Sequence, residues 1–232
     1  MNDILFLPGF MCDQHLWDDA RSGLEQLGSL HFGDLTRDRT FEAMAEHVLA
    51  GAPERFSLVG FSMGGFVARE IALMAPKRVE RLALLNTSAR GDSPEQAARK
   101  AGLAKAAEGR GFRGLSRHSI LSSLHPERQG DEGLVGKIRE MADLIGKDGF
   151  VNQIGVVRRD GHDLLARITC PTLVVWSRQD ALRSLEEAQE LADGIPDARL
   201  EIVEECGHML PLEAPQETVR LLADWLGQGG KP

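Results

Sequence analysis

The chain of 232 residues is 42% hydrophobic and 27% charged, which is the composition of an ordinary globular protein long enough to bury a substantial core. Its formal net charge of -8 and the lack of a basic run argue against a nucleic-acid partner. Three scattered cysteines, no secretion signal and no apolar stretch of membrane-spanning length predict a soluble, cytoplasmic protein without a membrane span.

Short apolar runs alternate with helical patterns along the first 88 residues. Strands are predicted at residues 3–10, 30–35, 56–61 and 81–86, and helices at residues 41–52 and 66–76. The first strand ends in Pro-Gly, which predicts a turn. Strands that alternate with helices in this way predict a mostly parallel sheet covered by helices on both faces.

Residues 89–168 break this alternation, because they show helical patterns and no convincing strand. Ser93 followed by Pro94 is typical of a helix start, with serine as the cap and proline at the first position. Further helical spacing appears at Leu134, Ile138, Met141 and Ile145, and again at Phe150, Ile154 and Val157. We interpret this segment as a helical cap inserted between two strands.

The alternation resumes after the insertion. Strands are predicted at residues 172–177 and 198–205, and a helix at residues 215–227 that begins with proline and ends at glycine. The α/β core is therefore predicted to comprise residues 1–88 and 169–232, with residues 89–168 as the cap.

The segment LVGFSMGGFV, residues 58–67, places Ser62 between a predicted strand and a predicted helix. A very tight turn at this joint would force Ser62 toward positive φ at some cost in strain. Gly60 and Gly64 would then be needed where side chains come too close, and Gly65 would let the helix pack near the strand. Such a turn exposes a serine hydroxyl beside a helix N-terminus, a typical position for a nucleophile.

A serine needs an adjacent base, and the base needs an orienting group. Asp180 follows one predicted strand and His208 follows another, which gives the chain order Ser62, Asp180, His208. All three lie at carboxyl ends of predicted strands, where open parallel sheets place their chemistry. Asn86, which follows a neighbouring strand, is not an acid, and this favours Asp180 as the orienting group.

The motifs LPGF, HLW, GFSMGG, CPTLVVWSRQD and CGHMLPLEAP resemble, in this order, those of the α/β-hydrolase family. The resemblance covers nearly the whole chain apart from the cap, and it implies an α/β-hydrolase fold that the chain enters late, without the opening antiparallel strands of many members. It implies Ser62 as nucleophile, His208 as base and Asp180 as acid. It also implies an oxyanion hole made by the backbone N–H groups of Phe10 and Met63, and it implies no cofactor.

Two positions depart from the family pattern. Pro8 precedes Gly9 where many members have histidine, so that any hydrogen bond from that histidine is lost. Ser177 stands before the acid where glycine is common. Neither change removes the predicted turn or the predicted acid.

These features predict a serine hydrolase that cleaves a carboxylic ester of a small or medium acyl group through an acyl-enzyme. The same three residues would also serve lactone opening, carbon–carbon bond hydrolysis, elimination or peracid formation, and a non-catalytic ligand-binding protein of this fold is a further alternative. The sequence leaves the substrate, its acyl chain length and the oligomeric state open.

Several other polar residues and cysteines are further site candidates. Cys12 is interpreted as a small buried hydrophobe rather than a reactive thiol. His118 and His125 in the cap are expected at the surface, with the alternative that one faces the pocket. Arg158 and Arg159 are candidates for binding a substrate carboxylate, although a solvated helix face is the favoured interpretation. No zinc-type ligand spacing and no dinucleotide-binding glycine pattern is present, so neither a metal site nor a dinucleotide site is predicted.

Overall fold

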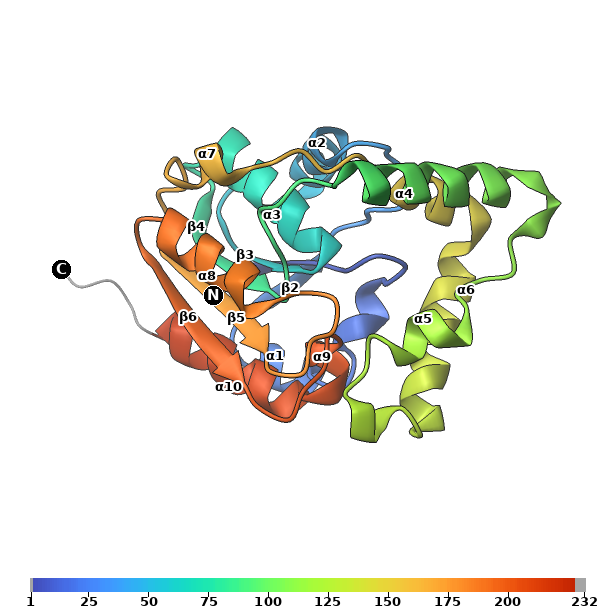
Figure 1. Ribbon diagram of the computed structural model, residues 1–232. Coiled ribbons are helices and arrows are strands. Elements are labelled where there is room, and N and C mark those ends of the chain that lie inside the picture. Colours follow the sequence, from blue (N-terminus) through green and yellow to red (C-terminus); the bar gives the residue numbers. More distant parts are fainter. Residues whose placement is uncertain (1, 228–232) are drawn as a thin grey trace.

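The computed structural model describes residues 2–227 and is built on one six-stranded sheet in the order β2-β1-β3-β4-β5-β6 (Figure 1). The strands are β1 (Asp3–Leu7), β2 (Ser29–Phe32), β3 (Phe56–Phe61), β4 (Val79–Leu85), β5 (Thr172–Ser177) and β6 (Ala198–Val203). Each neighbouring pair is parallel, so the carboxyl ends of the six strands meet at one edge. The predicted parallel sheet is confirmed. Met1 and residues 228–232, which the predicted core includes, lie outside the described residues.

Helices cover both faces of the sheet, as predicted. On one face lie α2 (Phe41–Gly51), α3 (Met63–Met74) and α8 (Leu185–Gly194), and on the other lie η1 (Gln14–Trp17), α1 (Arg21–Leu24), α9 (Leu210–Glu213) and α10 (Pro215–Gly227). Side chains alternate along each strand: Leu5 joins the core beneath α2 and α3, whereas Phe6 joins the core beneath α1 and α10. No helix within residues 2–227 is both long enough and apolar enough to cross a membrane.

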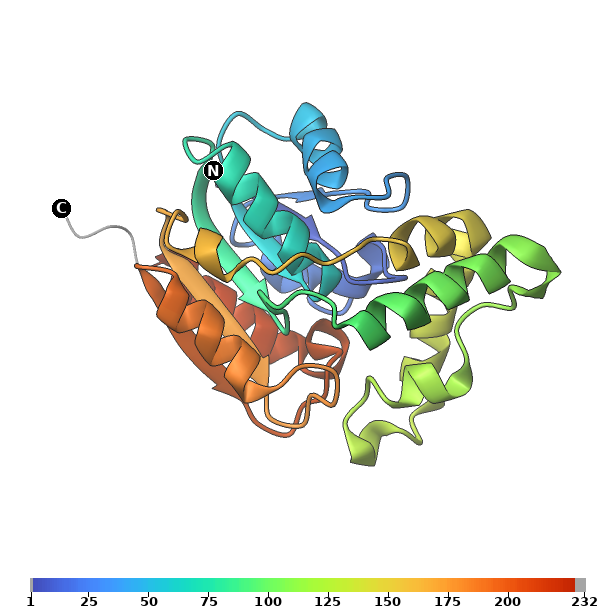
Figure 2. The ribbon, with the colours of Figure 1, turned by 45° about the horizontal axis from the view of Figure 1, so that its top comes forward.

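Residues 89–168 carry helices and no strand. Their elements are α4 (Pro94–Ala106), η2 (Ala107–Gly111), α5 (Arg117–Leu121), η3 (Pro126–Arg128), α6 (Glu132–Ile154) and α7 (His162–Leu165). Figures 1 and 2 show α4, α5 and α6 grouped on one side of the sheet-containing body. The predicted start of α4 is confirmed, because the Ser93 side chain accepts a hydrogen bond from the N–H of Gln96 in a capping box.

The end of α6 differs from the prediction. The helical spacing of Phe150, Ile154 and Val157 predicts a helix that includes Val157, but α6 ends at Ile154 and Val157 is 67% exposed. The helix is also broken at Gly146, which has φ 68° and ψ -166°. A glycine tolerates this conformation without a steric penalty, and the break lies between the two predicted apolar series, which end at Ile145 and resume at Phe150.

Candidate active site

Ser62 occupies a strained turn between β3 and α3, with φ 50° and ψ -111°. The predicted need for glycine is met on both sides. A Cβ atom on Gly64 would lie 2.4 Å from the carbonyl oxygen of Leu7, and one on Gly60 would lie 2.6 Å from the carbonyl oxygen of Gly64. The helix begins at Met63, three residues earlier than predicted, because these glycines are helical residues and not a loop. The turn therefore presses the first turn of α3 against the end of β1.

The structure brings together the three residues that the sequence places far apart. His208 Nε2 lies 2.8 Å from Ser62 Oγ, and His208 Nδ1 lies 2.7 Å from Asp180 Oδ2. The other oxygen of Asp180 accepts the backbone N–H groups of Leu182 and Arg183 at 2.7 and 3.0 Å. Ser62 is 8% exposed and His208 is 4% exposed. When Nδ1–H donates to the carboxylate, Nε2 is left as an acceptor for the serine proton.

Asn86, which from the sequence serves only to exclude a rival acid, connects Ser177 and His208 through hydrogen bonds. It is buried at the end of β4 and has φ 44°. Its Nδ2 donates to the carbonyl oxygen of His208 at 2.9 Å and to Ser177 Oγ at 2.9 Å, and its Oδ1 accepts the N–H of Ser177 at 2.9 Å. One amide therefore bridges the two loops that carry Asp180 and His208. Its only sequence signal is a polar residue directly after the apolar run of residues 82–85.

The segment after α5 contacts the His208 loop through backbone groups. The carbonyl oxygen of Ser123 accepts the N–H groups of His208 and Met209 at 2.9 and 3.2 Å. The Glu213 carboxylate accepts the N–H of His125 at 2.7 Å and that of Met209 at 3.1 Å. Burial raises the pKa of Glu213, although these N–H donors oppose the shift. The segment of residues 89–168 is thus hydrogen-bonded directly to the loop that carries His208.

The loop after β1 is held by the far end of α6. Met11 has φ 55°, and its N–H donates to Oε1 of Gln153 at 2.8 Å. Gln153 is 2% exposed, and its Nε2 donates to the carbonyl oxygen of Leu35 at 3.2 Å. The N–H of Phe10 donates no hydrogen bond within the described residues. Met63 opens α3, where helix N–H groups lack an intrahelical acceptor. Gln153 was not a candidate, since nothing in its local pattern points across 142 residues to Met11.

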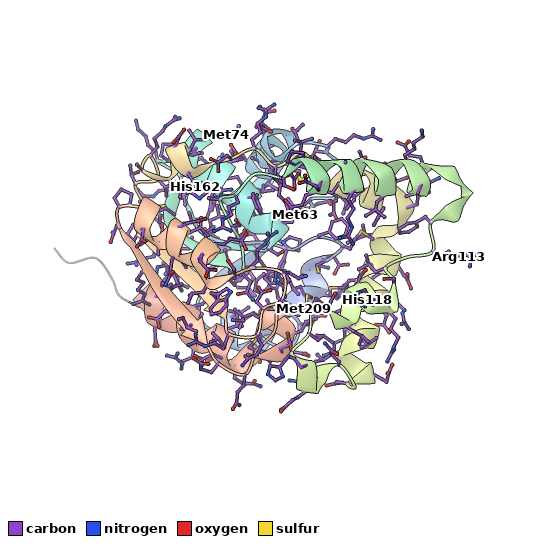
Figure 3. All side chains as sticks on the ribbon, viewed as in Figure 1. Met63, Met74, Arg113, His118, His162 and Met209 are labelled. Atoms are coloured by element: carbon purple, nitrogen blue, oxygen red, sulfur yellow. The ribbon has the colours of Figure 1, made fainter. Side chains whose placement is uncertain are left out.

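The remaining candidates have different environments. His118, labelled on α5 in Figure 3, is exposed, and His125 is half-buried. The prediction of a solvated helix face at Arg158 and Arg159 is wrong, because both follow the end of α6 in irregular chain. Arg159 is exposed, whereas the Arg158 guanidinium carbon lies 5.1 Å from the centre of the Phe66 ring. Among residues 2–227, no group of three His, Cys, Asp or Glu side chains could hold a metal ion.

All three cysteines are buried, which confirms the interpretation of Cys12. Burial raises the pKa of Cys12 to about 12, that of Cys170 to about 11 and that of Cys206 to about 12. The reactive form of cysteine is the thiolate, so these thiols are unreactive near neutral pH.

The comparisons with known proteins agree on one family. Residues 4–221 match the family model described as "Alpha/beta hydrolase family". A thermophilic esterase from Thermogutta terrifontis, solved with malate bound, has a TM-score of 0.87 and 27% identity, over 98% of this chain and 90% of that one. The 2-hydroxy-6-oxononadienedioate/2-hydroxy-6-oxononatrienedioate hydrolase of Cupriavidus pinatubonensis is 29% identical, over 75% of this chain and 63% of its own length. The rat monoacylglycerol lipase ABHD6 is 32% identical over 31% of this chain, which spans 21% of that protein.

The close approach at Gly64 gives a test of the turn. We expect Gly64→Ala to lower the free energy of unfolding by on the order of 1–3 kcal/mol, because its Cβ would meet backbone carbonyl oxygens that cannot move aside cheaply. Gly102→Ala in α4 is the matched control: no atom lies within 4 Å of its Cβ, so it should stabilise the helix by up to about 1 kcal/mol. Urea unfolding measures the free energy of unfolding of both variants. Equal values for the two would contradict the packing argument.

The cysteines give a second test. At pH 8 the raised pKa values leave a thiolate fraction of roughly 10⁻³ or less at each of the three positions. We therefore expect native protein to resist iodoacetamide at pH 8 and to take up three labels after unfolding in urea, as measured by intact mass. Rapid labelling of any one cysteine in the native protein would show that its site opens to solvent.

Proposed function

Because the chain belongs to the alpha/beta hydrolase family, we propose that it is a serine hydrolase that cleaves a carboxylic ester of a small or medium acyl group. The observation that carries this proposal is the hydrogen-bonded series from Asp180 through His208 to Ser62 at the carboxyl edge of the sheet. The 27% identity to a solved esterase over 98% of this chain supports the choice of an ester among the substrates of the family.

In the first half of the reaction, Ser62 Oγ attacks the ester carbonyl while its proton passes to His208 Nε2 over the 2.8 Å contact. Asp180 holds the imidazole with Nδ1 protonated and stabilises the imidazolium that forms. The same Nε2 then returns the proton to the departing alkoxide, so that the alcohol leaves and an acyl-Ser62 ester remains.

In the second half, His208 Nε2 takes a proton from water, and the hydroxide attacks the acyl carbonyl. Collapse of the tetrahedral intermediate releases the carboxylic acid and returns the proton to Ser62. In both halves we assign the oxyanion to the N–H of Met63, at the start of α3, and to the N–H of Phe10. The start of a helix also supplies a partial positive charge where the oxyanion develops.

We assign residues 1–88 and 169–232 to the hydrolase core and residues 89–168 to a cap over the substrate. Three rings support this division. Phe10 of the core packs against Phe150 of α6, with ring centres 5.6 Å apart, and Phe112 packs on Phe150 at 4.9 Å. Two rings from the insertion thus meet one from the loop after β1, and they form an apolar wall suited to an acyl chain.

The rival reactions use the same serine, so substrates must separate them. Lactone opening, carbon–carbon bond hydrolysis, elimination and peracid formation start from the same Ser-His-Asp series. Turnover of p-nitrophenyl esters of increasing chain length, measured beside lactones, thioesters and a vinylogous 1,5-diketone, identifies the preferred reaction. Higher kcat/KM for a lactone or a diketone than for every ester would overturn the ester assignment while keeping the hydrolase.

The role of Ser62 gives a direct prediction. We expect Ser62→Ala to remove esterase activity by up to about a million-fold without changing the melting temperature markedly, since it deletes only the attacking oxygen. A fluorophosphonate probe should label the wild-type protein at Ser62 and leave the variant unlabelled, as measured by peptide mass. Esterase activity of the variant within tenfold of wild type contradicts the nucleophile assignment, and a wild-type protein that resists the probe favours a non-catalytic binding role.

The contact between Gln153 and Met11 tests the oxyanion assignment. Gln153→Met keeps the length of the side chain but removes the acceptor for the Met11 N–H, so the loop that aims the Phe10 N–H loses its anchor. An oxyanion donor is worth about 10²–10³ in rate, and we expect its misplacement to lower kcat by on the order of tenfold or more.

Asn152→Leu is the matched control, because the neighbouring amide also donates to a backbone carbonyl, that of Thr36, whereas the Met11 N–H donates to Gln153. It should lower kcat by less than about threefold. Equal losses of kcat in the two variants, at equal melting temperatures, would mean that the end of α6 acts only through general stability.

A further inference from the structure

Three arginines surround one aromatic ring beside the candidate nucleophile. The guanidinium carbons of Arg69, Arg158 and Arg183 lie 5.1, 5.1 and 5.8 Å from the centre of the Phe66 ring. They come from α3, from the chain that follows α6, and from the loop that follows Asp180. Like charges repel, so the convergence of three cations from separate elements on one ring needs an explanation.

The carboxylate nearest to Arg158 is already matched by another cation. Asp92 Oδ2 accepts Lys100 Nζ at 2.7 Å and the backbone N–H of Arg158 at 2.9 Å. The Arg158 guanidinium lies farther away, with Nε 3.9 Å from Asp92 Oδ1, which is beyond hydrogen-bond distance. Within residues 2–227 the Arg158 guanidinium therefore makes no hydrogen bond, although it is only 24% exposed.

Arg183 is only partly satisfied. Its Nη1 donates to Glu187 Oε1 at 3.2 Å, and in the described part of the chain its Nε is buried without a hydrogen-bond partner. Burial lowers the pKa of Arg158 to about 10, and the positive charge of Arg183 is the second cause of that shift. The guanidinium groups of Arg158 and Arg183 are therefore close enough to repel each other, and each keeps N–H donors that make no hydrogen bond in the described part of the chain.

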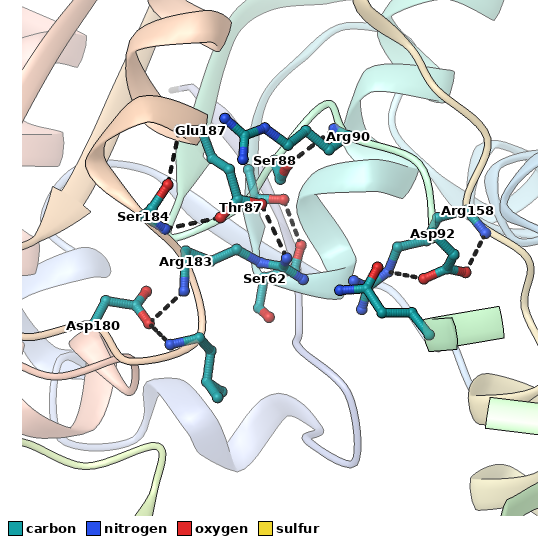
Figure 4. A network of polar contacts seen from close by, with 12 residues as sticks. Ser62, Thr87, Ser88, Arg90, Asp92, Arg158, Asp180, Arg183, Ser184 and Glu187 are labelled. Carbon is teal, nitrogen blue, oxygen red and sulfur yellow. Dashed lines mark hydrogen bonds and ion pairs between the residues drawn. The ribbon is translucent and has the colours of Figure 1, made fainter. Parts of the chain in front are cut away.

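This positive charge lies over Phe66, close along the chain to the turn that holds Ser62. The backbone N–H of Arg183 donates to Asp180 Oδ1 at 3.0 Å, while its guanidinium reaches Phe66, which is four residues beyond Ser62 in the first turns of α3. Figure 4 shows Arg183 extending from the Asp180 loop toward Ser62, with Asp92 and Arg158 beyond it. An anion held by these guanidinium groups would lie beside Phe66 of α3, the helix that begins directly after Ser62.

We propose that Arg158 and Arg183 form a carboxylate-binding subsite, so that the substrate is an ester that carries a free carboxylate. This inference rests on the proposed ester hydrolysis and adds the substrate class to it. Guanidinium groups bind carboxylates through paired N–H donors, and a partly desolvated pair binds more strongly than an exposed one. Lys100 pairs with Asp92 and Glu187 takes one N–H of Arg183, so the remaining guanidinium N–H donors of both arginines are available to a ligand.

Matched substrates test the proposal. Monomethyl glutarate carries the carboxylate on the acyl side, and its neutral isostere is methyl 5-methylhexanoate. The ester 3-acetoxypropanoate carries it on the alcohol side, and its isostere is 3-methylbutyl acetate. We expect wild-type kcat/KM, measured by pH-stat, to be at least tenfold higher for one charged ester than for its isostere, and the preferred pair identifies the side that faces the arginines.

Variants separate binding from packing. Arg158→Met and Arg183→Met keep an apolar stem over Phe66, and each should lower the charged-to-neutral ratio of kcat/KM at least tenfold. Arg178→Met is the control, since its guanidinium carbon lies 5.7 Å from the Trp176 ring but pairs with Glu204 at the surface. It should leave the ratio unchanged. If the arginine variants lower kcat/KM equally for the charged ester and its neutral isostere, the ratio stays constant. This result would show that the arginines serve packing alone and would overturn the proposal.

Direct binding keeps this inference separate from the proposed hydrolysis. If the wild-type protein hydrolyses none of these esters, titration of glutarate by calorimetry decides. Saturable binding that weakens at least tenfold in Arg158→Met supports the carboxylate subsite in a protein whose reaction is not ester hydrolysis. Absence of glutarate binding in that case overturns the subsite as well.

Discussion

The positive-φ turn at Ser62 is the constraint on which the site depends. It brings the first turn of α3 so close to the end of β1 that a Cβ on Gly64 would lie within 3 Å of the carbonyl oxygens of both Leu7 and Pro8. This contact sets the separation between the serine and the loop that carries Phe10. A looser turn would move the nucleophile and both proposed oxyanion donors relative to one another, and catalysis of acyl transfer tolerates little such movement.

Much of this arrangement could be predicted from the sequence, because it follows from local patterns. The apolar runs predicted the strands, and strand ends in a parallel sheet share one edge, so Ser62, Asp180 and His208 were expected together. Helix α8 was not predicted, since only a narrow apolar stripe, Ala188 and Leu191, is buried along it. The Asn86 bridge, the Gln153 anchor and the convergence of Arg158 and Arg183 on Phe66 could not be predicted, for another reason. Each joins segments about 90 to 150 residues apart, and spacing within one segment carries no record of such a partner.

The segment of residues 89–168 is attached to the site at two ends. The carbonyl oxygen of Ser123 accepts hydrogen bonds from the N–H groups of His208 and Met209, and Oε1 of Gln153 accepts one from the N–H of Met11. The segment that faces the proposed acyl pocket therefore also contacts the His208 loop, through Ser123, and the loop after β1, through Gln153 of α6. Under the proposed function, a change in this segment that suits a new substrate would alter the geometry of the site unless these contacts persist, which would couple substrate range to turnover.

The strand order also has a consequence during synthesis on the ribosome. Strand β4 ends at Leu85, but its neighbour β5 begins only at Thr172. Translation proceeds at roughly 5–20 residues per second, so several seconds pass between the synthesis of β4 and that of β5. During this time the first four strands can pair, but the outer edge of β4 has no partner strand. An unpaired edge of this kind recruits other strands, including those of other nascent chains. The long insertion between the two strands therefore makes the newborn chain a natural client for chaperones that shield sheet edges.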